Sequence, residues 1–310
     1  MNTHSDNPQA TVAAVGMFDG VHLGHCSVLD RLSAEARSRS MQSLALTFSR
    51  HPLELVDANR APHLITDTAT RITLLRSGGI DRAETLDFTP ELRALSGRAF
   101  LDMLHRRYGV RVLVMGYDNH IGSDRLDAAA AAVLTPCTGI EIVQVDERTI
   151  GGTGSLSSTS IRNALATGNV TRAACILGRY YTVEGTVTSG NRLGRTIGFP
   201  TANIDTPSDI IIAEGAYAVD VTIDGDCRRM RGMANIGRRP TLGKNGERRL
   251  EVNIFDFSAD IYGRRLRVEF LQLLRGETQF ASLDDLKQQL TADRQAATSV
   301  RRMTNFNLTD

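Results

Sequence analysis

The sequence offers little to tie the protein to a membrane or to export. Its first ten residues are polar and lack the positive-then-apolar pattern of a signal peptide. No apolar run approaches the ~20 residues that a membrane-spanning helix needs. We therefore expect a cytoplasmic protein without a membrane partner.

Cysteine is scarce as well. The four cysteines are scattered along the chain, and no two of them have the CxxC spacing of a zinc site. They also lack the density of a disulfide framework. Reduced thiols are the simplest interpretation of Cys26, Cys137, Cys175 and Cys227.

The chain also has almost no net charge. The 36 Lys and Arg residues nearly balance the 35 Asp and Glu residues, which leaves a net charge of +1. A nucleic-acid partner held by a broad basic surface is therefore not expected, and the local Arg-Arg pairs are interpreted as solvated faces. Apolar residues make up 41% of the chain and charged residues 23%, which predicts an ordinary folded protein.

What the chain does have is length enough for two domains. Its 310 residues are about twice the usual length of a single domain. A helical pattern gives way to β-rich sequence in the middle of the chain. There we place the boundary, with a first domain of residues 1–178 and a second of residues 179–310.

In the first domain, short apolar runs alternate with segments of helical period. This alternation predicts an α/β fold with a doubly wound parallel sheet, whose ligands bind beyond the carboxyl ends of the strands. The strands are predicted over 12–17, 43–48, 83–87, 110–115 and 140–145, and the main helices over 27–38, 69–76 and 98–108.

The second domain lacks crossover helices between its strand patterns. Strands at regular spacing, separated by Gly, Asp and Asn turns, predict an antiparallel β-barrel that a C-terminal helix closes. A short helix is expected over 170–177, strands over 181–187, 217–223, 230–236, 250–257 and 266–274, and the last helix over 282–292.

A turn rich in glycine and histidine follows the first predicted strand, from Gly16 to His25. Gly16 and Gly24 permit tight backbone approach, and the N-terminus of the next helix offers N–H groups to an anion. The imidazoles of His22 and His25 can donate hydrogen bonds to phosphate oxygens as charge builds on them. The turn predicts phosphate chemistry, and it is not a Walker loop because GxxxxGK[ST] is missing.

Hydroxyl side chains gather far downstream, in Leu156-Ser157-Ser158-Thr159-Ser160-Ile161-Arg162. Taken alone, this segment is a good helix N-cap followed by a surface arginine. Taken with the HxGH turn, it is the second half of a clamp for the β and γ phosphates of ATP. The residues by themselves leave both interpretations open.

The two motifs together resemble the nucleotidyltransferases that transfer adenylyl groups through HxGH and SSTxxR motifs. More narrowly, GxFDGVHxGH resembles bacterial FMN adenylyltransferase, the N-terminal module of bifunctional riboflavin kinase/FAD synthetase. The resemblance implies catalytic roles for His22, His25 and Arg162. It implies nucleotide contacts for Gly16, Phe18, Asp19, Gly24, Asp118, Ser158 and Thr159.

Two supporting segments depart from the pattern of that family. TFDPHP has become TFSRHP, which removes an acid at Ser49. GxDFxFG has become GYDNHIG, which places Asn119 and Ile121 at the aromatic positions. In relatives the second segment helps to line the flavin and nucleotide pocket, so these replacements bear on substrate affinity in the first domain.

A second glycine-rich segment, Gly194-Arg195-Thr196-Ile197-Gly198-Phe199-Pro200-Thr201-Ala202-Asn203, lies early in the β-rich half. Its glycines allow a loop to wrap a polyphosphate. Thr201 and Asn203 alternate on a strand, so their oxygens share one face as hard ligands for Mg²⁺. A purely structural turn is the alternative for these two residues.

Glu251 lies among apolar neighbours in a predicted strand. It is either a satisfied edge acid or a carboxylate that faces Mg·ATP and accepts a hydroxyl proton. From residue 182 to residue 293, GRTIGFPTAN, the Glu251 strand and LRGETQF follow in the order that resembles bacterial riboflavin kinase, although Ser189 stands where relatives often carry His.

This second resemblance implies a six-stranded barrel that binds Mg²⁺·ATP and riboflavin. Thr201 and Asn203 would hold the metal, and Glu251 would act as the base for the ribityl 5′-hydroxyl. The glycine loop would contact ATP, and Arg275 would contact the flavin or the phosphates. The residues given these binding roles are Gly190, Gly194, Arg195, Gly198, Pro200 and Arg275.

The combined expectation is a bifunctional enzyme of flavin cofactor synthesis. It would phosphorylate riboflavin to FMN with ATP, and then adenylylate FMN to FAD with release of pyrophosphate. One alternative keeps the kinase but makes the first domain an impaired or different nucleotidyltransferase, because of Ser49, Asn119 and Ile121. The other is a flavin-binding or flavin-delivering protein without turnover.

Overall fold

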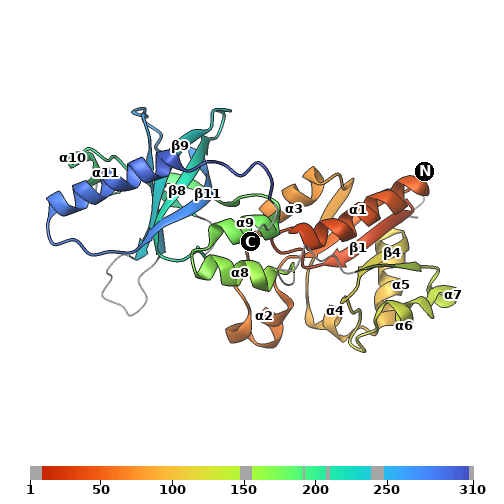
Figure 1. Cartoon of the computed structure of the whole chain (residues 1–310). Coiled ribbons are helices and arrows are strands. Elements are labelled where there is room, and N and C mark those ends of the chain that lie inside the picture. The colour runs from red at the N-terminus through yellow and green to blue at the C-terminus, as the bar shows by residue number, and fades with distance from the viewer. Residues whose placement is uncertain (1–8, 147–155, 191–192, 207–209, 239–247, 307–310) are drawn as a thin grey trace, which may run out of the picture. The chain divides into compact units, whose positions relative to one another are not determined.

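The computed structural model describes residues 9–146, 156–190, 193–206, 210–238 and 248–306 (Figure 1). The chain divides into two compact units, Met1–Leu156 and Ser157–Asp310. Helices α8 (Ser158–Ala166) and α9 (Val170–Leu177) belong to the second unit. The functional boundary expected between residues 178 and 179 stays a prediction.

Among the described residues, no helix combines the length and the apolar character that a membrane crossing requires.

The first unit is built on five parallel strands in the order β3-β2-β1-β4-β5, which confirms the predicted doubly wound sheet. The chain starts at the centre with β1, moves outward to β3, and returns to β4 beside β1. Ligands bind such sheets at this switch point, beyond the strand ends. The strands are β1 (Thr11–Gly16), β2 (Gln42–Phe48), β3 (Arg82–Leu86), β4 (Val110–Gly116) and β5 (Glu141–Val145).

Helices cover both faces of this sheet because its strands are apolar on both sides. Leu101 and Leu104 of α5 (Gly97–Tyr108) pack with Ala13 on one face. Leu32 of α1 (Leu23–Ser38) and Leu75 of α3 (Thr68–Ser77) pack with Val12 and Ala14 on the other. The shorter helices are α2 (Pro52–Val56), the 3₁₀ turn η1 (Ala58–Arg60), α4 (Pro90–Ala94), α6 (Ala128–Ala132) and α7 (Thr135–Thr138).

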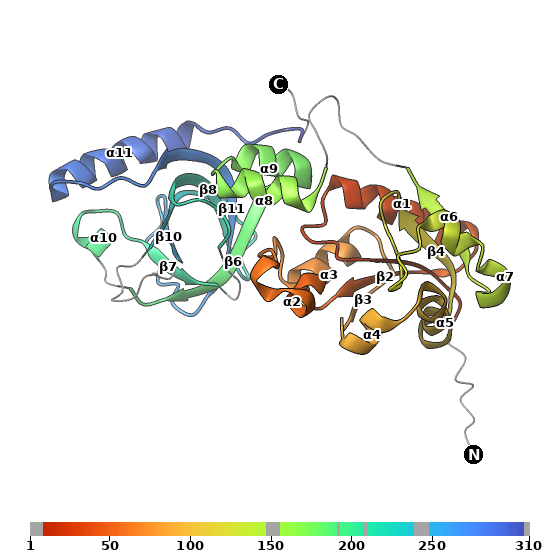
Figure 2. The same cartoon turned by 90° about the horizontal axis from the view of Figure 1, so that it is seen from below.

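The second unit is a closed barrel of six antiparallel strands in the order β10-β7-β6-β11-β8-β9 (Figure 2). The barrel confirms the predicted architecture, and its sixth strand, β7, follows the short helix α10 (Leu193–Thr196) and has no counterpart among the five strand ranges predicted from the pattern. The strands are β6 (Tyr181–Thr188), β7 (Ala202–Asp205), β8 (Gly215–Ile223), β9 (Met230–Arg238), β10 (Arg248–Ile254) and β11 (Arg265–Gly276).

A C-terminal helix, α11 (Leu283–Ser299), packs across β8, β9 and β11. Its Leu290 and Ala297 meet apolar side chains of the barrel wall, among them Met233. The helix continues past residue 292, where the sequence pattern predicts its end. Arg231 explains the extension, because its Nη1 donates to the carbonyls of Ala297 and Val300 at 2.8 and 2.7 Å and so satisfies the last turn.

Candidate functional site

The turn between β1 and α1 has a backbone that is costly to form. Phe18, Gly20 and Val21 have φ values of 47°, 80° and 39°, and a β-branched residue such as Val21 rarely adopts a positive φ. Such conformations persist only where the surroundings over-determine them. Contacts with other segments of the protein must therefore stabilise the turn.

Asp19 supplies one set of these contacts. Its side chain is buried, and its carboxylate accepts hydrogen bonds from the backbone N–H groups of Ile65 at 2.9 Å and Thr66 at 3.1 Å. The Thr66 hydroxyl oxygen accepts a further bond from the Gly20 N–H at 3.1 Å. The loop before α3 thus fixes the phosphate-handling turn, and the nucleotide contact expected of Asp19 stays a prediction.

The carbonyl of Met17 is a second anchor of the turn. It accepts hydrogen bonds from Thr47 Oγ1 at 2.8 Å and from Arg71 Nη1 at 2.9 Å. Arg71 is fully buried, and this burial lowers the pKa of its guanidinium, while the charges of Asp19 and Asp67 oppose that shift. Sequence reasoning missed Arg71, whose only signal is a charge in the middle of an otherwise amphipathic helix.

We expect Asp19→Ala to lower the free energy of unfolding of the first unit by about 3 kcal/mol, because two buried N–H groups lose their acceptor. Thermal denaturation measures this loss. The matched control is Asp30→Ala on the exposed side of α1, which should change the stability by less than about 0.5 kcal/mol. Equal stability of the two variants would contradict this role of Asp19.

His22 and His25 cap the start of α1 for each other. The Nδ1 atom of His22 accepts from the His25 N–H at 3.4 Å, and the Nδ1 atom of His25 accepts from the His22 N–H at 3.3 Å. The two rings stack with their centroids 3.6 Å apart. Because each Nδ1 is an acceptor, the neutral rings carry their protons on Nε2. Both histidines therefore have a donor to offer to a phosphate.

Neighbouring atoms leave little room for a side chain at Gly16 and Gly24. A Cβ on Gly24 would lie 2.7 Å from the Leu156 carbonyl oxygen and 3.0 Å from the His22 ring. A Cβ on Gly16 would lie 3.3 Å from the ring of Phe18, which itself meets His25 edge to face. The glycines of the motif thus serve the packing of the histidines.

Ser158, Thr159 and Arg162 lie on α8, which Ser157 caps by accepting from the Ser160 N–H at 3.2 Å. The N-cap predicted from the hydroxyl cluster is therefore present. These residues belong to the second unit and the histidines to the first. The phosphate clamp that would join them stays a prediction.

The positions that depart from the family pattern have clear local roles. Ser49 donates from Oγ to Asp87 Oδ1 at 2.7 Å, so a carboxylate stands beside the position where the family pattern has an acid. Ile121 is buried in the apolar cluster of α5. Asn119 donates its N–H to the carbonyl of Gly116, and the carbonyl of Asp118 lies 3.0 Å from His120 Nδ1.

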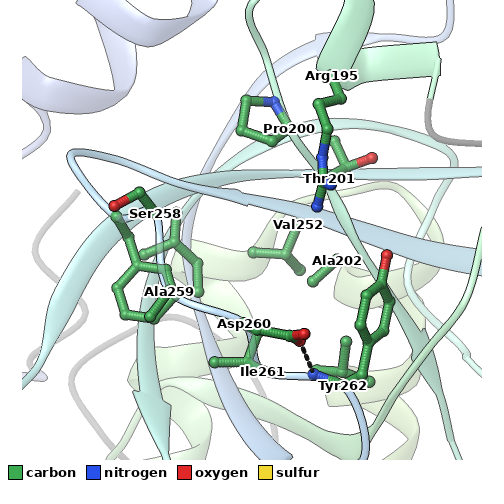
Figure 3. A pocket seen from close by; sticks show the side chains of 13 residues that line it. Arg195, Pro200, Thr201, Ala202, Val252, Ser258, Ala259, Asp260, Ile261 and Tyr262 are labelled. Carbon is green, nitrogen blue, oxygen red and sulfur yellow. Dashed lines mark hydrogen bonds between the residues drawn. The ribbon is translucent and has the colours of Figure 1, made fainter.

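Thr201 lines two neighbouring cavities of the barrel. The larger, of about 500 Å³, is open and is lined by residues of β7, β10 and the loop that precedes β11. Figure 3 shows Arg195 and Tyr262 extending into it from opposite sides. Asp260 accepts from the Tyr262 N–H at 3.0 Å and shapes this rim.

The smaller cavity, of about 330 Å³, lies between the barrel wall and α11. One row of residues crosses five strands at its floor, because the register sets each residue opposite the next. This row is Asn203, Glu251, Asn235, Ala216 and Arg275. Apolar side chains of the same cavity are Ile197, Phe199, Met233, Phe280, Leu286 and Leu290.

Glu251 lines the smaller cavity next to Thr201, the residue that both cavities share. It lies directly opposite Asn203 in the β10–β7 pair, and Thr201 Oγ1 is 3.4 Å from its Oε2. The structure thus brings the predicted base and the two predicted metal ligands together. A group held in the smaller cavity and one held in the larger can meet beside this carboxylate.

The glycines before β7 also serve close packing. A Cβ on Gly190 would lie 2.1 Å from Asn203 Nδ2, and a Cβ on Gly194 would lie 2.2 Å from the Phe199 carbonyl oxygen. Gly198 has a φ of +84°, which favours glycine. Gly190 and Gly194 thus allow close packing against Asn203 and Phe199, and the contact of this loop with a nucleotide stays a prediction.

The predicted magnesium ligands are two neutral oxygens that lie beside one carboxylate. Among the residues that the structure describes, no three His, Cys, Asp or Glu side chains gather as a metal site. Thr201 and Asn203 supply a hydroxyl and an amide oxygen next to Glu251. This donor set fits Mg²⁺, which keeps several waters and takes its remaining ligands from substrate phosphates.

Arg275 ties the barrel to α11. Its guanidinium forms an ion pair with the buried Asp293 at 2.9 Å, and it stands 5.4 Å over the ring of Phe280. Gln289 adds a hydrogen bond to Asp293 at 2.8 Å. Arg275 thus holds the cover of the smaller cavity, and the substrate contact expected of it stays a prediction.

Breaking this tie should loosen α11. We expect Asp293→Asn to lower the free energy of unfolding by about 2 kcal/mol, because the partly buried Arg275 loses its partner. Asp256→Asn is the matched control, since Asp256 pairs with Arg294 of α11 at an exposed position and should cost less than about 0.5 kcal/mol. Thermal denaturation compares the two, and similar losses would contradict the assignment.

Two family models match the chain. The FAD synthetase model matches residues 4–160, and the riboflavin kinase model matches residues 177–301. Curated proteins named bifunctional riboflavin kinase/FMN adenylyltransferase are similar over most of the chain. The Escherichia coli K12 protein is 36% identical over 93% of this chain and 92% of its own length. The Pseudomonas fluorescens protein is 39% identical over 92% and 91%.

A relative from Bacillus subtilis, which bears the same name, is 32% identical over 93% of this chain and 91% of its own. Among solved structures, one described as a macrolide-efflux protein from Streptococcus pneumoniae has a TM-score of 0.84 at 33% identity. It covers 94% of this chain and 95% of that one. Each of these matches therefore extends over both units of the chain.

Proposed function

Because the chain belongs to the family of bifunctional riboflavin kinase/FMN adenylyltransferases, we propose that each of its two reactions uses one of the sites described above. The enzyme phosphorylates riboflavin to FMN, and it joins FMN to the adenylyl group of ATP to give FAD. Both steps are in-line displacements at phosphorus, in which positioning and charge neutralisation supply most of the catalysis.

The kinase site is the junction of the two barrel cavities. The larger, open cavity with Arg195 takes ATP, and the smaller one takes the flavin ring between its apolar side chains. The observation that carries this assignment is the position of Glu251 in the smaller cavity, opposite Asn203 and 3.4 Å from Thr201, which lines both cavities. From there Glu251 accepts the proton of the 5′-hydroxyl as that oxygen attacks the γ phosphate.

Thr201 and Asn203 would hold the Mg²⁺ that accompanies ATP in this site. When bound, the ion neutralises charge on the phosphates. The glycine loop with Gly190, Gly194 and Gly198 follows the phosphates.

The adenylyltransferase site is the turn at the switch point of the parallel sheet. Here Nε2 of His22 and of His25 donate to phosphate oxygens, next to the N-terminus of α1. Ser158, Thr159 and Arg162 complete the clamp around the leaving pyrophosphate. Supporting this, a Cβ on Gly24 would meet the Leu156 carbonyl oxygen, and the hydroxyl motif begins at the next residue in the chain, Ser157.

The two reactions define the partners: riboflavin, FMN, ATP and Mg²⁺. We also place the enzyme in the cytoplasm, since both reactions consume ATP.

One incubation separates the proposal from its two rivals. Pure protein is mixed with riboflavin, ATP and Mg²⁺, and the flavins are separated by chromatography. The proposal expects FMN to form first and FAD to follow. FMN without FAD would indicate an impaired first unit, as Ser49, Asn119 and Ile121 would explain. No conversion at all would indicate a flavin-binding protein without turnover.

A further inference from the structure

Asn253 is a polar residue in the wall of the smaller cavity that neither motif includes. It lies on β10 two residues after Glu251, so both side chains are on the same face of the strand, and both line the cavity. Only 4% of Asn253 is exposed. A buried amide needs hydrogen-bond partners for both its nitrogen and its oxygen.

The protein satisfies one end of this amide. Asn253 Nδ2 donates to the carbonyl oxygen of Pro200 at 2.6 Å. Because a carbonyl can only accept, this bond fixes which end of the amide is nitrogen and which is oxygen. Oδ1 is consequently an acceptor that points away from Pro200, and it has no hydrogen-bond partner among the described residues.

An unpaired buried acceptor beside a substrate cavity calls for a donor from the substrate. We infer that Asn253 Oδ1 accepts a hydrogen bond from an inner hydroxyl of the ribityl chain of riboflavin, an assignment that rests on the proposed kinase site. The isoalloxazine ring requires the apolar side of the cavity, while the polar floor begins at Glu251 and continues to Asn253.

Spacing selects the ribityl chain. Residues two apart on one strand face are separated by roughly 7 Å. With the 5′-hydroxyl at Glu251, the 2′, 3′ and 4′ hydroxyls lie within that reach, and each is a donor. Asn253 would then link the two cavities. Its Oδ1 would meet the ribityl chain, and its Nδ2 bonds to Pro200, which lines the larger cavity proposed for ATP.

The test compares two flavins in the kinase reaction of the full chain: riboflavin as substrate, and lumiflavin, which lacks the ribityl chain, as competitive inhibitor. Asn253→Leu keeps the size of the side chain but removes both the acceptor Oδ1 and the donor that holds Pro200, so lumiflavin reports any change of the cavity that does not involve the ribityl chain. We expect the KM for riboflavin to rise roughly 10-fold and the Ki of lumiflavin to change less than about 2-fold. Met233→Leu, opposite Asn253 on β9, is the control that should move both flavins alike.

A second comparison does not depend on the folding of a variant. In the wild-type enzyme, one of the riboflavin analogues that lack a single inner hydroxyl should have a KM raised by about 10-fold. Equal changes for riboflavin and lumiflavin in Asn253→Leu, or unchanged KM values for every deoxy analogue, would overturn the inference alone. Failure of the wild type to phosphorylate riboflavin would overturn the proposed kinase site together with it.

Discussion

Glu251→Gln is expected to lose riboflavin phosphorylation by a factor of roughly 10²–10⁴, the range found when a general base is removed. Glutamine matches glutamate in size and can still meet Thr201, so the site keeps its shape. It cannot accept the proton of the 5′-hydroxyl. The measurement is the rate of FMN formation from riboflavin, ATP and Mg²⁺.

The same variant should still make FAD when FMN is supplied, because the HxGH turn belongs to the other unit. Glu184→Gln is the matched control: Glu184 lies on β6 of the same barrel and pairs with Arg265 at the surface. It should retain kinase activity. Loss of FAD synthesis in Glu251→Gln, or full kinase activity, would contradict the assignment of two separate sites.

Elements with long apolar runs could be predicted from the sequence nearly to the residue. The inner strands of the parallel sheet, β1, β2 and β4, are largely buried, so their apolar runs stand out between helical segments. Strand β7 has only four residues, and α2, α4, α6 and α7 have four or five, too few to show a period. The end of α11 depends on Arg231, which is distant in sequence.

In the two sites, too, local features could be predicted from the sequence and features that depend on distant residues could not. The motif residues at Gly16–His25 and at Thr201, Asn203 and Glu251 could be identified because their types and spacing are local. What holds them is not local. Asp19 depends on N–H groups of residues 65 and 66, and the pairing of Glu251 with Asn203 depends on strand register. Asn253 could have been found only as a polar residue two positions from Glu251 in an apolar strand.

His25→Ala is expected to lose FAD synthesis and to keep riboflavin phosphorylation, the reverse of Glu251→Gln. Without Nε2 of His25, charge on the transferring phosphates loses a donor placed at a helix N-terminus, and such donors are worth roughly 10²–10³ in rate. FAD formation from FMN and ATP should fall by that factor, while FMN formation from riboflavin stays unchanged. His63→Ala, at an exposed position of the same unit, is the control and should leave both activities intact.

A second substitution separates chemistry from the helix cap. Ala at position 25 also removes the acceptor for the His22 N–H, which costs about 1 kcal/mol of stability. His25→Asn keeps an acceptor for that N–H but has no donor at the place of Nε2. If His25 acts on phosphate, both variants lose FAD synthesis although only His25→Ala is less stable in thermal denaturation. Recovery of FAD synthesis in His25→Asn would instead mean that His25 serves the turn and not the reaction.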